Sequence, residues 1–80
     1  LHINAIAFSP NGKLYATVSM DKTLKIWDGS TDTLLKVVDK LRNEGHVTSV
    51  NKLLWINDDE LITCSDDRTI MMWRIEIDVA

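Results

Sequence analysis

The sequence has few of the residues that mark several common classes of protein. Cys64 is the only cysteine, so no disulfide can form within the chain, and no second ligand lies near it at a zinc-site spacing. The longest apolar runs, such as "LLWI" at 53–56, are far shorter than the roughly 20 residues that cross a bilayer. The opening residues also lack the charged and apolar regions of a signal peptide. We therefore expect an intracellular, cytoplasmic protein with no membrane partner.

Positive charge is also scarce. The chain holds 9 Lys and Arg residues against 12 Asp and Glu residues, which gives a formal net charge of -3. No basic field is available to attract phosphate backbones, so we expect no nucleic-acid partner. The hydrophobic share of 45% is typical of a folded domain. A domain of 80 residues nevertheless has a thin margin of stability unless something else covers it.

One ten-residue stretch occurs twice. The sequence "SMDKTLKIWD" at 19–28 returns as "SDDRTIMMWR" at 65–74, with Ser, Asp, Thr and Trp each 46 residues apart. A period of about 20 to 50 residues is typical of stacked supersecondary units. We expect one unit at residues 1–44, truncated at its start because no initiating Met is present, and a second at residues 45–80.

Inside each unit, the short apolar runs are rich in β-branched and aromatic residues and predict strands, and none is long enough for a helix. The expected strands are 3–8, 14–19, 23–27, 34–38, 48–55, 60–65 and 69–73. Asn11 and Gly12 lie between the first two, where positive φ suits a tight hairpin. The pattern predicts an all-β fold: two consecutive four-stranded antiparallel blades of a β-propeller, the last lacking its outer strand. The tail "IEIDV" at 75–79 either extends the third strand of the second unit or starts a fourth.

Four residue types at fixed spacings resemble a known family. Gly45-His46 precedes a strand, Ser65 and Asp67 lie at a hairpin, Trp73 follows six residues after that Asp, and Trp27-Asp28 closes the first unit. In these features the chain resembles the WD-repeat family from Ile3 to Ile75, although Arg74 stands where the family usually has Asp.

The resemblance implies a structural tetrad in each blade, made of a loop His, a strand hydroxyl, a turn Asp and a strand Trp. The matching positions are His46, Ser65, Asp67 and Trp73 in the second unit, and Ser19, Asp21 and Trp27 in the first. An indole N–H can only donate, and a hydroxyl can accept from it and donate onward. We therefore expect Trp73 to donate to Ser65, in a network that fixes the hairpin.

The resemblance also implies partner-binding positions, on the face where loops enter the innermost strands. These candidates are Ser49, Asn51 and Asp66 in the second unit, and His2, Asn4 and Met20 in the first. Loop positions on a rigid scaffold bind partners often, although they can also be merely exposed polar ends. The expected function is a non-catalytic protein–protein interaction scaffold that needs no cofactor. Its blades would pack against the other blades of a larger propeller, or against other copies of the chain in a homo-oligomer.

Three further interpretations concern a specific partner, catalysis and metal binding. The last unit resembles the final repeat of actin-interacting proteins, which implies a role with actin and cofilin in filament disassembly. Ser65, His46 and Asp67 are also the residue types of a hydrolase triad, but "TCSDD" at 63–67 has no glycine elbow. The acidic residues at 58–60 and 66–67 lack the alternating ligands and internal Gly of a calcium loop, so no metal site is expected.

Overall fold

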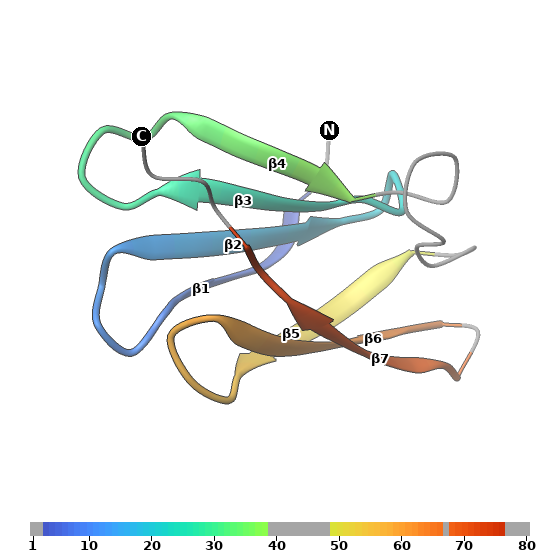
Figure 1. Ribbon diagram of the computed structural model, residues 1–80. Helices are drawn as coiled ribbons and strands as arrows, with labels where there is room; N and C mark the ends of the chain where they lie inside the picture. The colour runs from blue at the N-terminus through green and yellow to red at the C-terminus, as the bar shows by residue number, and fades with distance from the viewer. Residues whose placement is uncertain (1–2, 39–48, 67, 77–80) are drawn as a thin grey trace.

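The computed structural model describes residues 3–38, 49–66 and 68–76, and within these ranges the protein is made of seven strands (Figure 1). Each predicted strand is confirmed, with its ends within two residues of the expectation. The strands are β1 (Ile3–Phe8), β2 (Leu14–Ser19), β3 (Leu24–Asp28), β4 (Leu34–Val38), β5 (Val50–Trp55), β6 (Glu60–Ser65) and β7 (Ile70–Arg74). In the described part of the chain there is no helix, and so none long and apolar enough to span a membrane.

The strands form two antiparallel sheets in sequential order. β1, β2, β3 and β4 make a four-stranded sheet, the first blade, and β5, β6 and β7 make a three-stranded sheet, the second blade. Their hairpins β1–β2, β3–β4 and β5–β6 lie together at the left of Figure 1. This arrangement confirms the predicted blades. Because β7 ends at Arg74, the tail does not extend it through Ile75 and Glu76, and residues 77–80 lie outside the described ranges.

The two blades share a pattern of cross-strand rows, because alternate residues of a strand face opposite sides of the sheet. On one side of each blade the register aligns a row that carries aromatic residues, and on the other side an aliphatic row. The aromatic-bearing rows are Phe8, Tyr15 and Trp27 in the first blade, and Trp55, Leu61 and Trp73 in the second. The aliphatic rows are Ala7, Ala16 and Ile26 in the first blade, and Leu54, Ile62 and Met72 in the second.

The core lies between the blades. It joins the aliphatic side of the first blade to the aromatic-bearing side of the second, so that Ala16, Ile26, Trp55 and Leu61 belong to one buried cluster. The indole of Trp55 also donates to the carbonyl of Ala7 at 2.9 Å, which fixes the tryptophan against β1. The blades are therefore stacked face to face, and each supplies a different kind of surface to the contact.

Two glycines shape the first blade. Gly12 takes a φ of +73° in the β1–β2 hairpin, as predicted, whereas Asn11 does not adopt positive φ. Gly29 follows β3, and its N–H donates to the carbonyl of Lys13 at 2.7 Å. A Cβ at Gly29 would lie 2.5 Å from the carbonyl oxygen of Gly12, so the close approach of the two turns requires glycine.

Candidate functional site

The indole acceptors differ from the sequence-based expectation. Trp73 donates to Oγ1 of Thr63 at 2.8 Å, and Trp27 donates to Oγ1 of Thr17 at 3.1 Å. The expectation that Trp73 donates to Ser65 is therefore wrong. The strand hydroxyl that receives the indole lies two residues earlier in both blades.

Strand register explains this correction. Trp73 pairs with Leu61 across β6 and β7, so Thr63 is its diagonal neighbour on the same face, within reach of a large side chain. Ser65 lies four residues from Leu61, roughly 13 Å along the strand. The first blade repeats the geometry, because Trp27 pairs with Tyr15 and Thr17 is the diagonal neighbour.

In the first blade, Ser19 and Asp21 organise the β2–β3 turn. The hydroxyls of Ser19 and Thr23 both donate to Oδ1 of Asp21, and the Thr23 N–H donates to the same oxygen at 3.0 Å. Desolvation raises the pKa of Asp21, but these hydrogen bonds and the charge of Lys25, at 3.9 Å, outweigh it and lower the pKa below its ordinary value of 3.8. The carboxylate thus serves as an internal acceptor that closes the turn.

In the second blade, the described part of the turn is similar. Ser65 is buried, and its hydroxyl lies 3.4 Å from that of Thr69. His46 and Asp67 lie outside the described residues, so their place in a tetrad stays a prediction. A buried Ser65 at the end of β6 lacks the exposure that a nucleophilic serine requires.

The candidate partner-binding residues lie at one edge of the molecule. Asn4 is near the start of β1, Met20 follows β2, Ser49 and Asn51 flank the start of β5, and Asp66 follows β6. Because paired strands run antiparallel, the start of one lies beside the end of the next, and these positions gather at the right of Figure 1. We call Met20, Ser49, Asn51 and Asp66 the strand-entry edge. His2 lies outside the described residues.

Asn4 has a role within the structure that the sequence analysis did not anticipate. Its side-chain amide donates to Oγ of Ser49 at 2.9 Å and to the carbonyl of Val50 at 2.8 Å. Both bonds join the first blade to the second. The amide hydrogens of Asn4 are therefore used between the blades.

Hydrogen bonds link three of the four residues of the strand-entry edge, and the four are exposed to different degrees. Asn51 donates its side-chain amide to Oδ1 of Asp66, and the N–H of Asp66 donates to the carbonyl of Ser49 at 3.1 Å. Met20 is 58% exposed, and Asp66 is also exposed. The edge thus presents a carboxylate, an amide and a thioether on a backbone that is held by the two sheets.

The acidic hairpin between β5 and β6 contributes to the contact between blades. Oδ1 of Asp58 accepts the N–H of Asn11 at 2.8 Å. Within the described ranges, no three His, Cys, Asp or Glu side chains gather closely enough to hold a metal ion.

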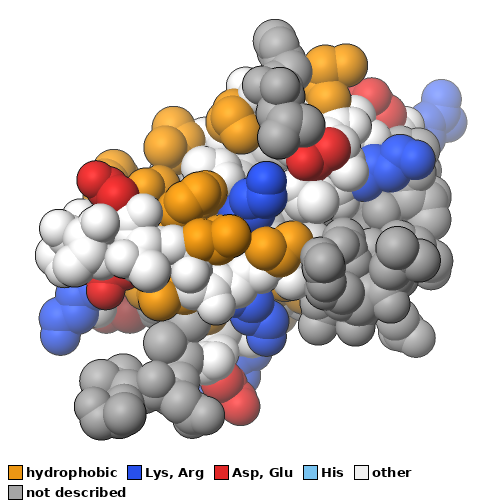
Figure 2. Space-filling model, turned by 90° about the horizontal axis from the view of Figure 1, so that it is seen from above, with side chains coloured by type: hydrophobic (Ala, Val, Ile, Leu, Met, Phe, Trp, Pro, Cys, Tyr) orange, Lys and Arg blue, Asp and Glu red, His pale blue; other side chains and the backbone are white. Residues whose placement is uncertain are grey.

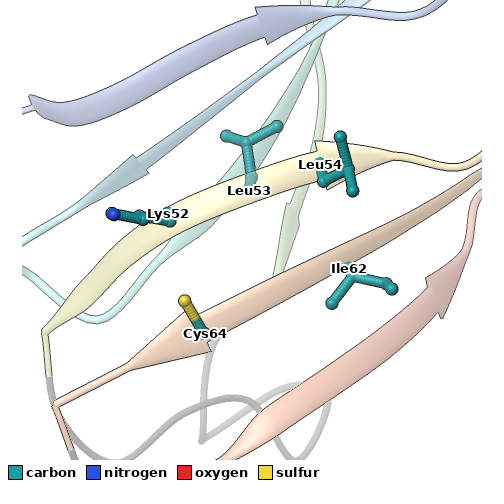
Figure 3. A pocket seen from close by; sticks show the side chains of 5 residues that line it. All are labelled: Lys52, Leu53, Leu54, Ile62 and Cys64. Carbon is teal, nitrogen blue, oxygen red and sulfur yellow. The ribbon is translucent and has the colours of Figure 1, made fainter.

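A shallow hollow of about 200 Å³ lies over β5 and β6. It is lined by Lys52, Leu53, Leu54, Ile62 and Cys64 (Figure 3). Four of these five residues are apolar, so the hollow offers few polar groups to orient a small molecule.

Comparison with known proteins identifies related sequences over most of the chain. The profile of the family described as "WD40: WD domain, G-beta repeat" matches residues 1–28 and 35–74. Actin-interacting protein 1 of Drosophila melanogaster is 32% identical over 75 residues, which cover 92% of this chain and 12% of that protein. SIR4-interacting protein SIF2 of Saccharomyces cerevisiae is 30% identical over 74 residues, covering 92% of this chain and 13% of that protein.

A third relative, the ribosome biogenesis protein WDR12 homolog of Drosophila virilis, is 29% identical over 87 residues, covering 95% of this chain and 21% of that protein. The chain thus spans from 12% to 21% of the length of these three curated relatives.

Solved structures share the fold. The WD40 β-propeller domain of Doa1 superimposes with a TM-score of 0.75 at 26% identity, over 91% of this chain and 23% of that one. The computationally designed Ika4 protein gives a TM-score of 0.76 at 31% identity, over 92% of this chain and 41% of that one. With the two stacked blades and the family profile in agreement, the chain belongs to the WD40 repeat family.

Proposed function

We propose that this chain is part of an intracellular, cytoplasmic protein–protein interaction scaffold, and that the strand-entry edge contacts the partner. The observation that carries the proposal is the grouping of Ser49, Asn51 and Asp66, with exposed Met20, at one edge of two packed sheets. Asp66 accepts one hydrogen bond from Asn51, and a carboxylate has about four acceptor sites. The edge can therefore accept N–H groups of a partner, while Met20 supplies an adaptable apolar contact.

In this proposal Asn4 positions the strand-entry edge and does not contact the partner. Because Asn4 holds Ser49 and the start of β5 against the first blade, its loss would move the edge without removing a contact to the partner. The buried position of Ser65 favours the scaffold over the hydrolase alternative.

A pull-down from cell extract tests the edge. The double variant N51A/D66A should lose the proteins that bind the parent chain. The matched control N57A/D59A changes the same residue types in the β5–β6 hairpin at the opposite end of the strands, and it should keep them. Equal retention of the bound proteins by both double variants would contradict the proposal, provided that circular dichroism shows the same sheet content.

A second candidate is favoured by one relative. Actin-interacting protein 1 is 32% identical to this chain, and we propose actin together with cofilin as the partner to test first. Co-sedimentation with actin filaments, with and without cofilin, should bring the parent chain into the pellet and leave N51A/D66A in the supernatant. A parent chain that stays in the supernatant under both conditions would exclude this partner and leave the general scaffold proposal to the pull-down.

A further inference from the structure

Asn11 combines a labile side chain with a position at the contact between the blades. Of the five asparagines in the sequence, it is the only one that is followed by glycine. The side-chain amide of asparagine is chemically labile, because the next backbone nitrogen can attack it, and a glycine leaves that nitrogen the least hindered. Asn11 and Gly12 are both exposed. They lie at the hairpin end of the molecule, toward the left of Figure 2, where acidic and basic side chains are also seen.

The closed β1–β2 hairpin holds the two groups that would react. The N–H of Gly12 donates to the carbonyl of Ser9 at 2.9 Å. Oδ1 of Asn11 accepts the hydroxyl of Ser9 at 2.8 Å and the N–H of Lys13 at 3.0 Å. Attack by the Gly12 nitrogen on Cγ of Asn11 requires both groups to leave these partners. The reaction therefore starts from an opened hairpin, just as a protected amide hydrogen exchanges only after local opening.

The second blade helps to keep this hairpin closed. Oδ1 of Asp58, in the β5–β6 hairpin, accepts the backbone N–H of Asn11 at 2.8 Å. A hydrogen bond to a charged group is stronger than one between neutral groups. Loss of this bond between the blades would therefore release the tip of the β1–β2 hairpin and leave Asn11 open to attack.

We propose that Asn11 is a site of spontaneous deamidation, and that this modification loosens the contact between the blades. The Gly12 nitrogen forms a bond to Cγ of Asn11, and the bond from Cγ to Nδ2 breaks. The proton of the Gly12 N–H passes through water to Nδ2, which leaves as ammonia. Water then opens the cyclic imide at either of its carbonyls and gives aspartate or isoaspartate. Water is the only co-reactant, and the loss of ammonia makes the change one-way.

Both products fit the contact between the blades less well than Asn11 does. Aspartate places a second carboxylate on the residue whose N–H is bound by the carboxylate of Asp58, and like charges repel. Isoaspartate lengthens the main chain of the hairpin by one methylene group, where the carbonyl of Gly12 already lies against Gly29. Each product therefore favours the opened hairpin.

Mass spectrometry of the folded chain, incubated in mildly alkaline buffer, tests the site. Asn11 should convert to the acid with time, and Asn57, which is exposed but followed by Asp58, should remain an amide. The variant Asp58→Ala should speed the conversion about two- to tenfold, the effect of one hydrogen bond on an opening equilibrium. The control Asp59→Ala, in the same hairpin, should keep the parent rate. An Asn11 that stays an amide, or a folded Asp58→Ala variant that converts at the parent rate, would overturn the proposal.

Urea unfolding of Asn11→Asp measures the effect of the aspartate product directly. This variant should have a lower urea midpoint than the parent chain. The loss should shrink when Asn11→Asp is combined with Asp58→Asn, because that change removes the second charge and keeps an acceptor oxygen at the contact. An unchanged midpoint for Asn11→Asp, or an equal loss with and without Asp58→Asn, would contradict the loosening of the blade contact.

Discussion

The two blades have the same strand plan but opposite exposure of equivalent faces. Trp55 is 8% exposed because its face packs on the first blade, whereas Phe8, at the equivalent position, is 57% exposed. The turns are closely matched, since Lys22 and Arg68 take φ values of 73° and 67° at equivalent positions. Local conformation therefore follows the repeat, and the stability that each residue contributes depends on whether a neighbouring blade covers it.

Truncation of the equivalent aromatic residues should give the largest contrast. Trp55→Ala removes a buried indole and its hydrogen bond to Ala7, and we expect a loss of about 3 to 5 kcal/mol of unfolding free energy. Phe8→Ala removes an exposed ring 5.1 Å from the ring of Tyr15, and a loss of about 1 kcal/mol is expected. Urea unfolding in dilute solution measures both. Equal losses would show that the blades are not stacked in this way.

Substitution of Gly29, between β3 and β4, should give the next largest loss of stability. Gly29 and Ile75 are equivalent, and their N–H groups donate to the carbonyls of Lys13 and Asp59, both at 2.7 Å. The β1–β2 hairpin of the first blade is longer than the β5–β6 hairpin of the second, and it places the carbonyl of Gly12 against Gly29. We expect Gly29→Ala to cost about 1 to 3 kcal/mol of unfolding free energy, as overpacking does.

Thermal or urea unfolding measures the effect of Gly29→Ala, with Gly12→Ala as the contrast. A Cβ at Gly12 would meet no atom within 4 Å, so that variant reports the cost of positive φ alone. Full stability of Gly29→Ala would mean that the two turns are not in close contact.

Removing an indole acceptor tests the corrected hydrogen bonds. Thr63→Val keeps the shape of the side chain and leaves the Trp73 N–H without this acceptor, so a loss of about 1 to 2 kcal/mol is expected. Thr17→Val should cost less, since Trp27 lies on the outer face of the first blade, where water can replace the lost acceptor. Urea midpoints compare the two variants, and a neutral Thr63→Val would contradict the assignment.

The smallest effect should be a dependence of folding stability on pH through Asp21. Since the pKa of Asp21 is lowered in the folded state, its contribution to stability is present above its ordinary value of 3.8 and is lost as the pH falls through the lower folded value. The parent chain should be more stable than Asp21→Asn near neutral pH, and this difference should shrink below about pH 4. Urea midpoints measured from about pH 6 down to pH 2 provide the test, and a difference that grows in acid would reverse the assigned sign.

The sequence predicted the strands well because their signals are local. Runs such as 14–19 and 60–65 carry β-branched residues between turn residues, and that pattern needs no knowledge of packing. The acceptor of Trp73 was predicted wrongly because the choice of Ser65 followed the tetrad implied by the family resemblance and did not take the strand register into account. Ser65 and Thr69 close the turn between β6 and β7. Counting residues away from this turn along both strands pairs Trp73 with Leu61, and Thr63 is then the diagonal neighbour of Trp73.

The contacts between blades could not be predicted in the same way. The bonds from Asn4 to Ser49 and from Trp55 to Ala7 join residues more than 40 positions apart. They depend on how two sheets stack, and no short pattern in the sequence records that geometry. For this reason Asn4 was predicted to bind a partner, whereas its side chain joins the two blades.

The most direct test of the stacked blades uses the three tryptophans. In a nuclear magnetic resonance spectrum of the dilute chain, they give three separate indole N–H signals. The stacked arrangement predicts slow hydrogen exchange for the Trp55 indole, a nuclear Overhauser effect from it to the methyl group of Ala7, and faster exchange for Trp27. A Trp55 indole that exchanges as fast as that of Trp27 and shows no contact with Ala7 would contradict the stacked arrangement.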